Sequence, residues 1–159
     1  MIENKRHGQG KFKWKNGNRY VGSYIDNKEH GNGILVYASN GDRYEGDWID
    51  GKKQGNGTLY HTNDNKYVGV WMDNKRHGPG TFDWSYGNRY VGAYIDGKEK
   101  GFGVFTHANG DKYEGEFHAG KRHGAGTLTL NGKSRHHSKV NGIMVSLKTE
   151  QETTQIKLK

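Results

Sequence analysis

The sequence predicts an all-β protein, built as an elongated, single-layer array of antiparallel β-hairpins with one hairpin in each repeat of about 23 residues. Three observations predict it. A motif of tyrosine, then glycine, then an aromatic residue returns at Tyr20, Tyr44, Tyr67, Tyr90 and Tyr113, at spacings of 24, 23, 23 and 23 residues. Residues that favour turns separate the aromatic runs. The 26 glycines also disfavour helix, because each costs roughly 1 kcal/mol relative to alanine.

The first strand of each repeat begins at its leading tyrosine, which we number position 1. Position 3 is always glycine and position 5 is always aromatic. Strand side chains alternate, so positions 1, 3 and 5 share one face. Glycine between two rings leaves room for a ring to lie over the backbone. The opposite face, at positions 2, 4 and 6, mixes aliphatic side chains with charges such as Glu45 and Asp47 and is partly hydrated.

A turn and a returning strand follow. The turn has the pattern Asp, then Asn or Gly, then Lys, as in Asp26-Asn27-Lys28, and these residues tolerate turn geometry. The returning strand opens with two glycines one residue apart, as at Gly31 and Gly33, and its positions 14, 16 and 18 share a face. A second turn, rich in Gly and Asn, leads to the next tyrosine. One extra residue near Asn40 explains the single spacing of 24.

The two ends of the chain depart from the repeat. Residues 1–19 form a partial N-terminal repeat, residues 20–130 five full repeats, and residues 131–159 a basic loop followed by a divergent capping hairpin or a tail. Met1 stands where other repeats carry an aromatic, which fits either a natural start or a truncated reading frame. The returning strand at residues 8–14 lacks a hairpin partner, so its open edge predicts a weak homodimer.

Composition narrows the location and the class of site. The chain has no cysteine, no apolar run of bilayer length and no secretion signal at its start. We expect a cytoplasmic location, with association with the cytoskeleton, a cilium or a membrane as alternatives. The net charge of +8 allows anionic partners.

No catalytic constellation is found. The glycine pairs precede strands, whereas a phosphate-binding loop precedes a helix. The histidines His7, His30, His77 and His123 recur about 10 Å apart, too far for two of them to share a metal ion. The sequence therefore predicts no enzyme activity, no cofactor and no metal site.

The repeat closely resembles the MORN repeat (membrane occupation and recognition nexus), with five full copies and one partial copy over residues 4–130. The resemblance implies an elongated, curved array, which strand spacing makes about 50–60 Å long. Some families place such arrays before phosphatidylinositol-phosphate kinase or SET methyltransferase domains. A repeat region of a larger enzyme is therefore one alternative.

The favoured function is a non-catalytic scaffold or adaptor that binds a protein partner through its aromatic face. A single-layer sheet cannot bury both faces by itself, and an apolar groove suits an amphipathic helix. The predicted groove residues are Tyr20, Tyr24, Tyr44, Trp48, Tyr67, Trp71, Trp84, Tyr90, Tyr94, Phe105, Tyr113 and Phe117.

The main alternative is a module that binds anionic lipid, such as a phosphoinositide, through two rows of cations. Aspartates two residues before the lysines partly neutralise them. Nucleic acid is disfavoured, because the rows lack a known reader fold. The candidate lipid-binding residues are Arg19, Lys28, Arg43, Lys52, Lys66, Lys75, Arg89, Lys98, Lys112 and Lys121.

Overall fold

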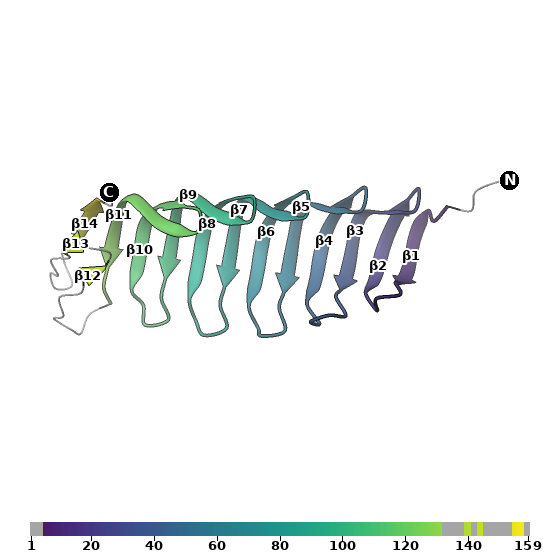
Figure 1. The fold of residues 1–159 in the computed structure, drawn as a ribbon, viewed down its shortest axis with the longest axis horizontal. Coiled ribbons are helices and arrows are strands. Elements are labelled where there is room, and N and C mark those ends of the chain that lie inside the picture. The colour runs from purple at the N-terminus through teal and green to yellow at the C-terminus, as the bar shows by residue number, and fades with distance from the viewer. Residues whose placement is uncertain (1–4, 132–138, 141–142, 145–153, 158–159) are drawn as a thin grey trace.

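The computed structural model describes residues 5–131, 139–140, 143–144 and 154–157. Figure 1 shows the strands of this part side by side in one long row. They form a 12-stranded antiparallel sheet in which β1 to β11 follow one another in chain order. The described residues contain no helix, and so none that could cross a bilayer. The predicted all-β hairpin array is confirmed.

The strands of this sheet alternate between the front and the returning strand of each repeat. They are β1 (Gly8–Lys13), β2 (Arg19–Ile25), β3 (Lys28–Val36), β4 (Arg43–Ile49), β5 (Lys52–Tyr60), β6 (Lys66–Met72), β7 (Lys75–Asp83), β8 (Arg89–Ile95), β9 (Lys98–Thr106), β10 (Lys112–His118), β11 (Lys121–Thr129) and β14 (Thr154–Lys157).

Each hairpin turns on two residues in the left-handed region. In the β2–β3 hairpin these are Asp26 and Asn27, with φ of 47° and 71°. A two-residue turn with positive φ at both positions matches the twist of the flanking strands, and Asp, Asn and Gly adopt it most readily. The β10–β11 turn is the exception, because Ala119 takes the first position with φ of 50°.

The turns of successive repeats are bonded to one another. The amide of Asn74, for example, donates to the carbonyl oxygen of Lys53 at 3.1 Å. Where the second turn residue is asparagine, its side chain adds a bond: Asn74 Oδ1 accepts from the amide of Lys53 at 2.9 Å, and Asn27 Oδ1 accepts from that of Arg6 at 2.8 Å. Each hairpin is thus joined to the next at its tight end.

The opposite ends of the hairpins are joined by a second set of bonds. Each inter-repeat loop has an Asn or Asp two residues before the leading tyrosine, and its side-chain oxygen accepts from a backbone amide in the next loop. The donor amides and acceptors are Ala38 to Asn18, Thr62 to Asp42, Ser85 to Asn65, Ala108 to Asn88 and Asn131 to Asp111, at 2.9–3.1 Å. The extra residue lengthens one loop, which the bond from Tyr37 N to Asp42 O closes.

The core lies on one side of the sheet, which we call the tyrosine face because it carries the five leading tyrosines. Each tyrosine ring lies over a pair of cross-strand glycines, such as Gly69 and Gly80 under Tyr67. A Cβ on Gly80 would lie 2.5 Å from the Tyr67 hydroxyl. That hydroxyl donates to the carbonyl oxygen of Val70 at 3.0 Å. The predicted space for a ring over the strand glycines is therefore present.

The rings of positions 1 and 5 form a continuous series of edge-to-face pairs from Tyr20 to Phe117. The nine centroid distances run from 4.9 to 5.4 Å, the spacing that aromatic pairs favour. From Trp48 onward, each position-5 ring contacts the tyrosine of its own repeat and that of the preceding one. Trp71, for example, lies between Tyr67 and Tyr44. This series of rings holds the single layer together.

The opposite face of the sheet stays open to solvent. Its aliphatic side chains are exposed by about two fifths or more, among them Val68 at 43% and Ile49 at 49%. Charged residues such as Glu45 and Asp47 lie between them in the strand alternation. This face agrees with the mixed, partly hydrated surface expected from positions 2, 4 and 6.

The ends of the array are described only in part. Among the described strands, β1 has one neighbour, β2, and the predicted homodimer through residues 8–14 stays a prediction. At the other end β14 pairs with β11, and β12 (Lys139–Val140) pairs with β13 (Ile143–Met144). Much of the predicted basic loop and capping hairpin, at 132–138, 141–142, 145–153 and 158–159, lies outside the described residues.

Candidate functional site

The structure places most of the predicted groove aromatics in the core. Ten of the twelve are buried, with exposed fractions of 6% or less: Tyr20, Tyr24, Tyr44, Trp48, Tyr67, Trp71, Tyr90, Tyr94, Tyr113 and Phe117. Only Trp84 and Phe105 are partly exposed. The buried rings are therefore the floor of the tyrosine face, and a partner on this face would contact the side chains above them.

A row of charged residues covers these rings. It occupies position 10 of each repeat, directly after the lysine that follows the turn, and we call it the position-10 row. Its members are Arg6, Glu29, Lys53, Arg76, Glu99 and Arg122. The position-10 residue pairs in register with the position-5 residue of its own hairpin, as Arg76 does with Trp71, and its side chain reaches the position-5 ring of the following repeat, as Arg76 reaches Tyr94. The row is the one part of this face whose charge changes sign from repeat to repeat.

Lys53 is the most deeply placed cation of the row, with 8% of its surface exposed. Its Nζ lies 4.7 Å from the ring centroid of Trp71, 5.0 Å from Tyr44 and 5.1 Å from Tyr37. Burial lowers the pKa of Lys53 to about 8, and the negative charge of Asp42 opposes this shift. The three rings also favour the charged form, because their faces attract a cation.

The arginines of the row have polar partners as well as rings. Arg76 Nη2 donates to the carbonyl oxygen of Gly97 at 2.9 Å, and its guanidinium lies 5.1 Å from the Tyr94 ring. Arg122 Nη2 lies 2.8 Å from Nε2 of His107, and burial, followed by the nearby Arg122, lowers the pKa of His107. These contacts hold both guanidinium groups over the aromatic floor.

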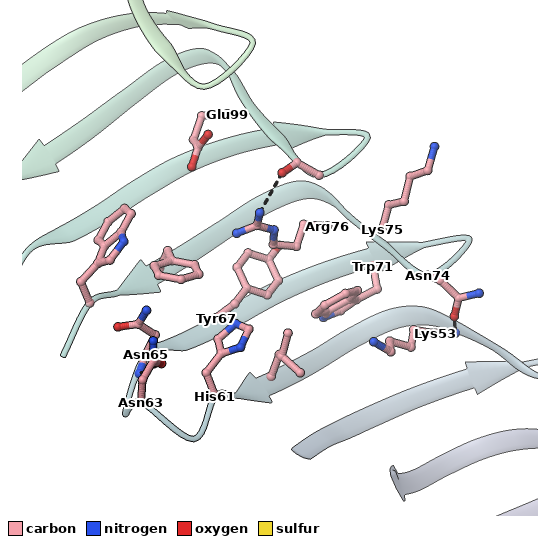
Figure 2. A pocket seen from close by; sticks show the side chains of 14 residues that line it. Lys53, His61, Asn63, Asn65, Tyr67, Trp71, Asn74, Lys75, Arg76 and Glu99 are labelled. Atoms are coloured by element: carbon pink, nitrogen blue, oxygen red, sulfur yellow. Dashed lines mark hydrogen bonds between the residues drawn. The ribbon is translucent and has the colours of Figure 1, made fainter. Parts of the chain in front are cut away.

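A hollow of about 720 Å³ opens on the tyrosine face over the three repeats that begin at Tyr44, Tyr67 and Tyr90. Figure 2 shows Lys53, Arg76 and Glu99 on successive hairpins around it, with Trp71 and Tyr67 below. Leu59, Phe82 and Trp84 supply its apolar lining. The hollow thus combines apolar contact area with a few charged groups, the mixture typical of a binding site.

One side of the hollow carries an aspartate–histidine pair. Oδ2 of Asp42 lies 2.7 Å from Nδ1 of His61, and Oδ1 of Asp42 accepts from the amide of Thr62 at 3.1 Å. Asp42 is buried, with 8% exposed, so these bonds satisfy its carboxylate. The pair holds the His61 ring toward the hollow (Figure 2). No serine, threonine or cysteine is among the residues that line the hollow.

The two predicted cationic rows are largely neutralised by neighbouring acids. Lysines at position 9 bridge to the turn aspartate of the following repeat, as Lys52 does to Asp73 at 2.7 Å and Lys75 to Asp96 at 3.3 Å. The predicted neutralisation therefore acts between repeats. In the second row, Arg43 pairs with Glu45 at 2.9 Å and Lys112 with Glu114 at 2.9 Å.

Seven of the ten candidate lipid-binding residues have an ion pair in the described structure: Lys28, Arg43, Lys52, Lys66, Lys75, Arg89 and Lys112. Arg19, Lys98 and Lys121 have none there. Lys98 lacks one because Ala119 replaces the turn aspartate in the next repeat.

The recurring histidines lie near the turns. Nδ1 of His7 accepts from the amide of Asp26 at 3.4 Å, and Gln54, at the same position of its repeat, accepts from the amide of Asp73 at 3.1 Å. The described residues contain no group of three side chains placed to hold a metal ion. His7 and Gln54 thus bond to the turn of the next repeat, whereas Nδ1 of His30 and Nδ1 of His77 have no hydrogen-bond partner among the described residues.

Sequence reasoning did not select the position-10 row or the bonds between the loops. Strand alternation alone would have placed position 10 on the same face as positions 14, 16 and 18, and every repeat carries a charge there. The sequence therefore contained this charge pattern, but the prediction selected the repeating aromatic residues, which lie beneath the position-10 row.

Comparison with known proteins gives a family and a set of distant structures. The family model described as the MORN repeat matches residues 1–19, 20–42, 44–66, 67–89, 90–112 and 113–135. No curated protein matches this chain.

Two of the solved structures that match come from Drosophila melanogaster. The SAS-4 (dCPAP) TCP domain, in complex with a proline-rich motif of Ana2 (dSTIL), is 15% identical, with a TM-score of 0.41, over 87% of this chain and 93% of that one. The TCP10c domain of Sas-4 is 17% identical, with a TM-score of 0.38, over 83% and 93%. At these scores neither carries an argument about function.

Proposed function

The chain belongs to the MORN-repeat family, and we propose that it is a non-catalytic scaffold that binds an amphipathic helix of a protein partner along its tyrosine face. The observation that carries the proposal is the hollow above Trp71 and Tyr67. Its lining joins partly exposed apolar side chains such as Trp84 to charged groups such as Arg76. An amphipathic helix presents the same combination.

The spacing of the repeats supports a helix as the occupant. Two strands about 4.8 Å apart give a repeat spacing of about 10 Å. Residues one heptad apart in an α-helix lie about 10.5 Å apart along its axis. A helix that lies along the array therefore presents an equivalent side chain to each successive repeat, which an extended strand, with its period of two residues, does not do as simply.

The lipid alternative receives less support from the structure. Most of its candidate cations already have a carboxylate partner, so a membrane would have to compete with that pair for each of them. A third reading, in which these repeats belong to a longer lipid-kinase or SET-methyltransferase protein, depends on sequence beyond the chain. Both remain alternatives, and the absence of enzyme activity remains a prediction.

The proposal is tested with a displayed library of helical peptides randomised at one heptad face. We expect binders to the wild-type chain that bind about tenfold more weakly, about 1.4 kcal/mol, when Trp84 and Phe105 are both replaced by alanine. The matched control replaces Ile49 and Ile95, exposed on the opposite face, and should leave affinity unchanged. Failure to select any binder, or equal losses in both variants, contradicts the proposal.

Salt separates the protein-binding and lipid-binding alternatives. Attraction between exposed charges falls steeply as the screening length drops from about 8 Å at physiological salt to about 3 Å at 1 M. Peptide binding that depends on apolar contact should persist in high salt. Vesicles containing phosphatidylserine or a phosphoinositide should bind no better than neutral vesicles at physiological salt, and binding that does favour them would support the lipid alternative.

A further inference from the structure

The position-10 row contains charged side chains that form no ion pair with any described residue. Lys53, Arg76 and Glu99 line the hollow, yet none of them has an ion pair in the described structure. Lys53 Nζ has aromatic rings around it and no hydrogen-bond acceptor. The position-10 residues of adjacent repeats lie about 10 Å apart, and no two of them form an ion pair in the described structure.

Much of the tyrosine face is the same in every repeat and says little about the register of a bound helix. Tyrosine, the glycine pair and the position-5 ring recur, so a helix shifted by one repeat, or one heptad, meets nearly the same floor. The side chains at positions 16 and 18 differ between repeats in shape, and the position-10 row differs in charge. From Glu29 to Arg122 its charges run negative, positive, positive, negative, positive.

We propose that Lys53, Arg76 and Glu99 select one charge pattern on the bound helix: two acidic side chains one heptad apart facing Lys53 and Arg76, then a basic side chain one heptad further facing Glu99. The inference rests on the proposed function and adds the chemistry and the register of the partner. Buried or half-buried charges without partners are costly, and a carboxylate that meets Lys53 or Arg76 satisfies donors that water reaches poorly.

For a helix that meets Lys53, Arg76 and Glu99 in this order, the charge order disfavours both neighbouring registers. A shift of one repeat in one direction places an acid against Glu99 and the base against Arg122. A shift in the other direction places an acid against Glu29 and the base against Arg76. Each shifted register contains two like-charge contacts, which specific interfaces use to exclude wrong partners. Over two intervals the heptad and repeat spacings differ by about 2 Å, which long side chains absorb. In the opposite direction the same pattern also fits Arg76, Lys53 and Glu29, because the charges from Glu29 to Glu99 run negative, positive, positive, negative.

The experiment uses the binders from the displayed library and fluorescein-labelled synthetic helices that differ only at three heptad-spaced positions. The patterns are acid–acid–base, base–acid–acid for the reverse helix direction, base–base–acid, and an uncharged glutamine triplet. We expect the library binders to be enriched in one of the first two patterns. That pattern should bind at least about tenfold more tightly than the glutamine helix in fluorescence anisotropy.

Matched variants identify the residues responsible. Lys53→Glu, Arg76→Glu and Glu99→Lys together should invert the preference, so that base–base–acid binds best. Lys53→Met with Arg76→Met, which keeps apolar contact with the rings, should abolish the preference without inverting it. The control Lys28→Gln with Lys52→Gln and Lys98→Gln changes position 9 and should retain it. Circular dichroism and melting confirm that each variant is folded.

The outcomes are separable. If no helix binds, the proposed function fails and this inference fails with it. If helices bind without regard to their charge pattern, helix binding stands and the inference is overturned. A preference that survives in the Met variant, or that disappears in the position-9 control, also overturns it, because the position-10 row would then not be its source.

Discussion

Lys52 and Lys53 are adjacent in the chain and have opposite electrostatic roles. Lys52 is exposed, and its bond to Asp73 of the next repeat raises its pKa. Lys53 is covered by three rings, and burial lowers its pKa to about 8. The difference follows from strand alternation, which places position 9 beside the next turn and position 10 over the aromatic floor. Of these two adjacent lysines, Lys52 thus forms an ion pair within the array and Lys53 forms none with any described residue.

The largest effect on stability should come from removing Trp71, one of the rings beneath Lys53. Trp71 is 3% exposed, lies between Tyr44 and Tyr67, and donates from Nε1 to the Gly57 carbonyl oxygen at 3.2 Å. We expect Trp71→Ala to cost about 3–5 kcal/mol. Lys75→Ala, an exposed position-9 change, should stay within about 0.5 kcal/mol. Equal shifts in melting temperature for the two variants would contradict this placement.

A smaller loss of stability should follow from a substitution that displaces the Tyr67 ring, which lies beneath Arg76. A Cβ at Gly80 would lie 2.5 Å from the Tyr67 hydroxyl, so Gly80→Ala should destabilise by about 1–3 kcal/mol. Gly10 occupies the same position in β1, and its nearest contact would be the Tyr24 ring at 3.5 Å. Gly10→Ala should therefore be neutral or slightly stabilising in chemical denaturation. Similar losses at both sites would show that strand glycine, and not the tyrosine above it, is responsible.

Lys53 should also give stability a dependence on pH. Its folded pKa of about 8 lies below the unfolded value of about 10.5. Between these values the unfolded chain binds more protons, so this residue makes stability rise with pH. Lys53→Met should remove that rise. At pH 7 the variant should be more stable than the wild type by at most about 1–2 kcal/mol, because the attraction between the cation and the rings offsets part of the burial penalty.

Denaturation of both proteins from pH 7 to 9.5 measures this effect. The buried tyrosines, whose pKa values burial raises, are common to both proteins and cancel in the difference. The advantage of the Met variant should shrink as the pH rises. A constant difference across the range would mean that Lys53 is not desolvated.

The smallest effect concerns Lys98, the position-9 lysine that lacks an ion-pair partner in the described structure because Ala119 replaces the turn aspartate of the next repeat. Ala119 adopts φ of 50°, a conformation that Asp and Asn adopt more readily. Ala119→Asp and Ala119→Asn should both raise stability, by about 0.5–1 kcal/mol. Only the aspartate could pair with Lys98, and an exposed pair adds little. A clear advantage of Asp over Asn in melting temperature would show that the ion pair matters.

The fold could be predicted because its determinants are local and repeat. The tyrosine period, the strand glycines and the Asp-Asn and Asp-Gly turns each define one hairpin, and stacking of hairpins follows. The candidate site could not be located in the same way. Whether Tyr67 or Arg76 faces a partner depends on how deeply each ring is covered, a property of three strands together. The hydrogen bonds that the side chains of Asn65 and its equivalents accept likewise join residues about 20 positions apart.

From β1 to β10 each strand pairs only with its neighbours in the chain, and this has a consequence for how such a protein diversifies. A duplicated or lost unit of 23 residues adds or removes two edge-to-face ring pairs and one position-10 charge, while the remaining hairpins keep their own environment. A point change at position 10, such as Lys53 to glutamate, rewrites the charge order without altering the tyrosine series beneath. Inherited variation can therefore alter what the array recognises and how long it is, independently of whether it folds.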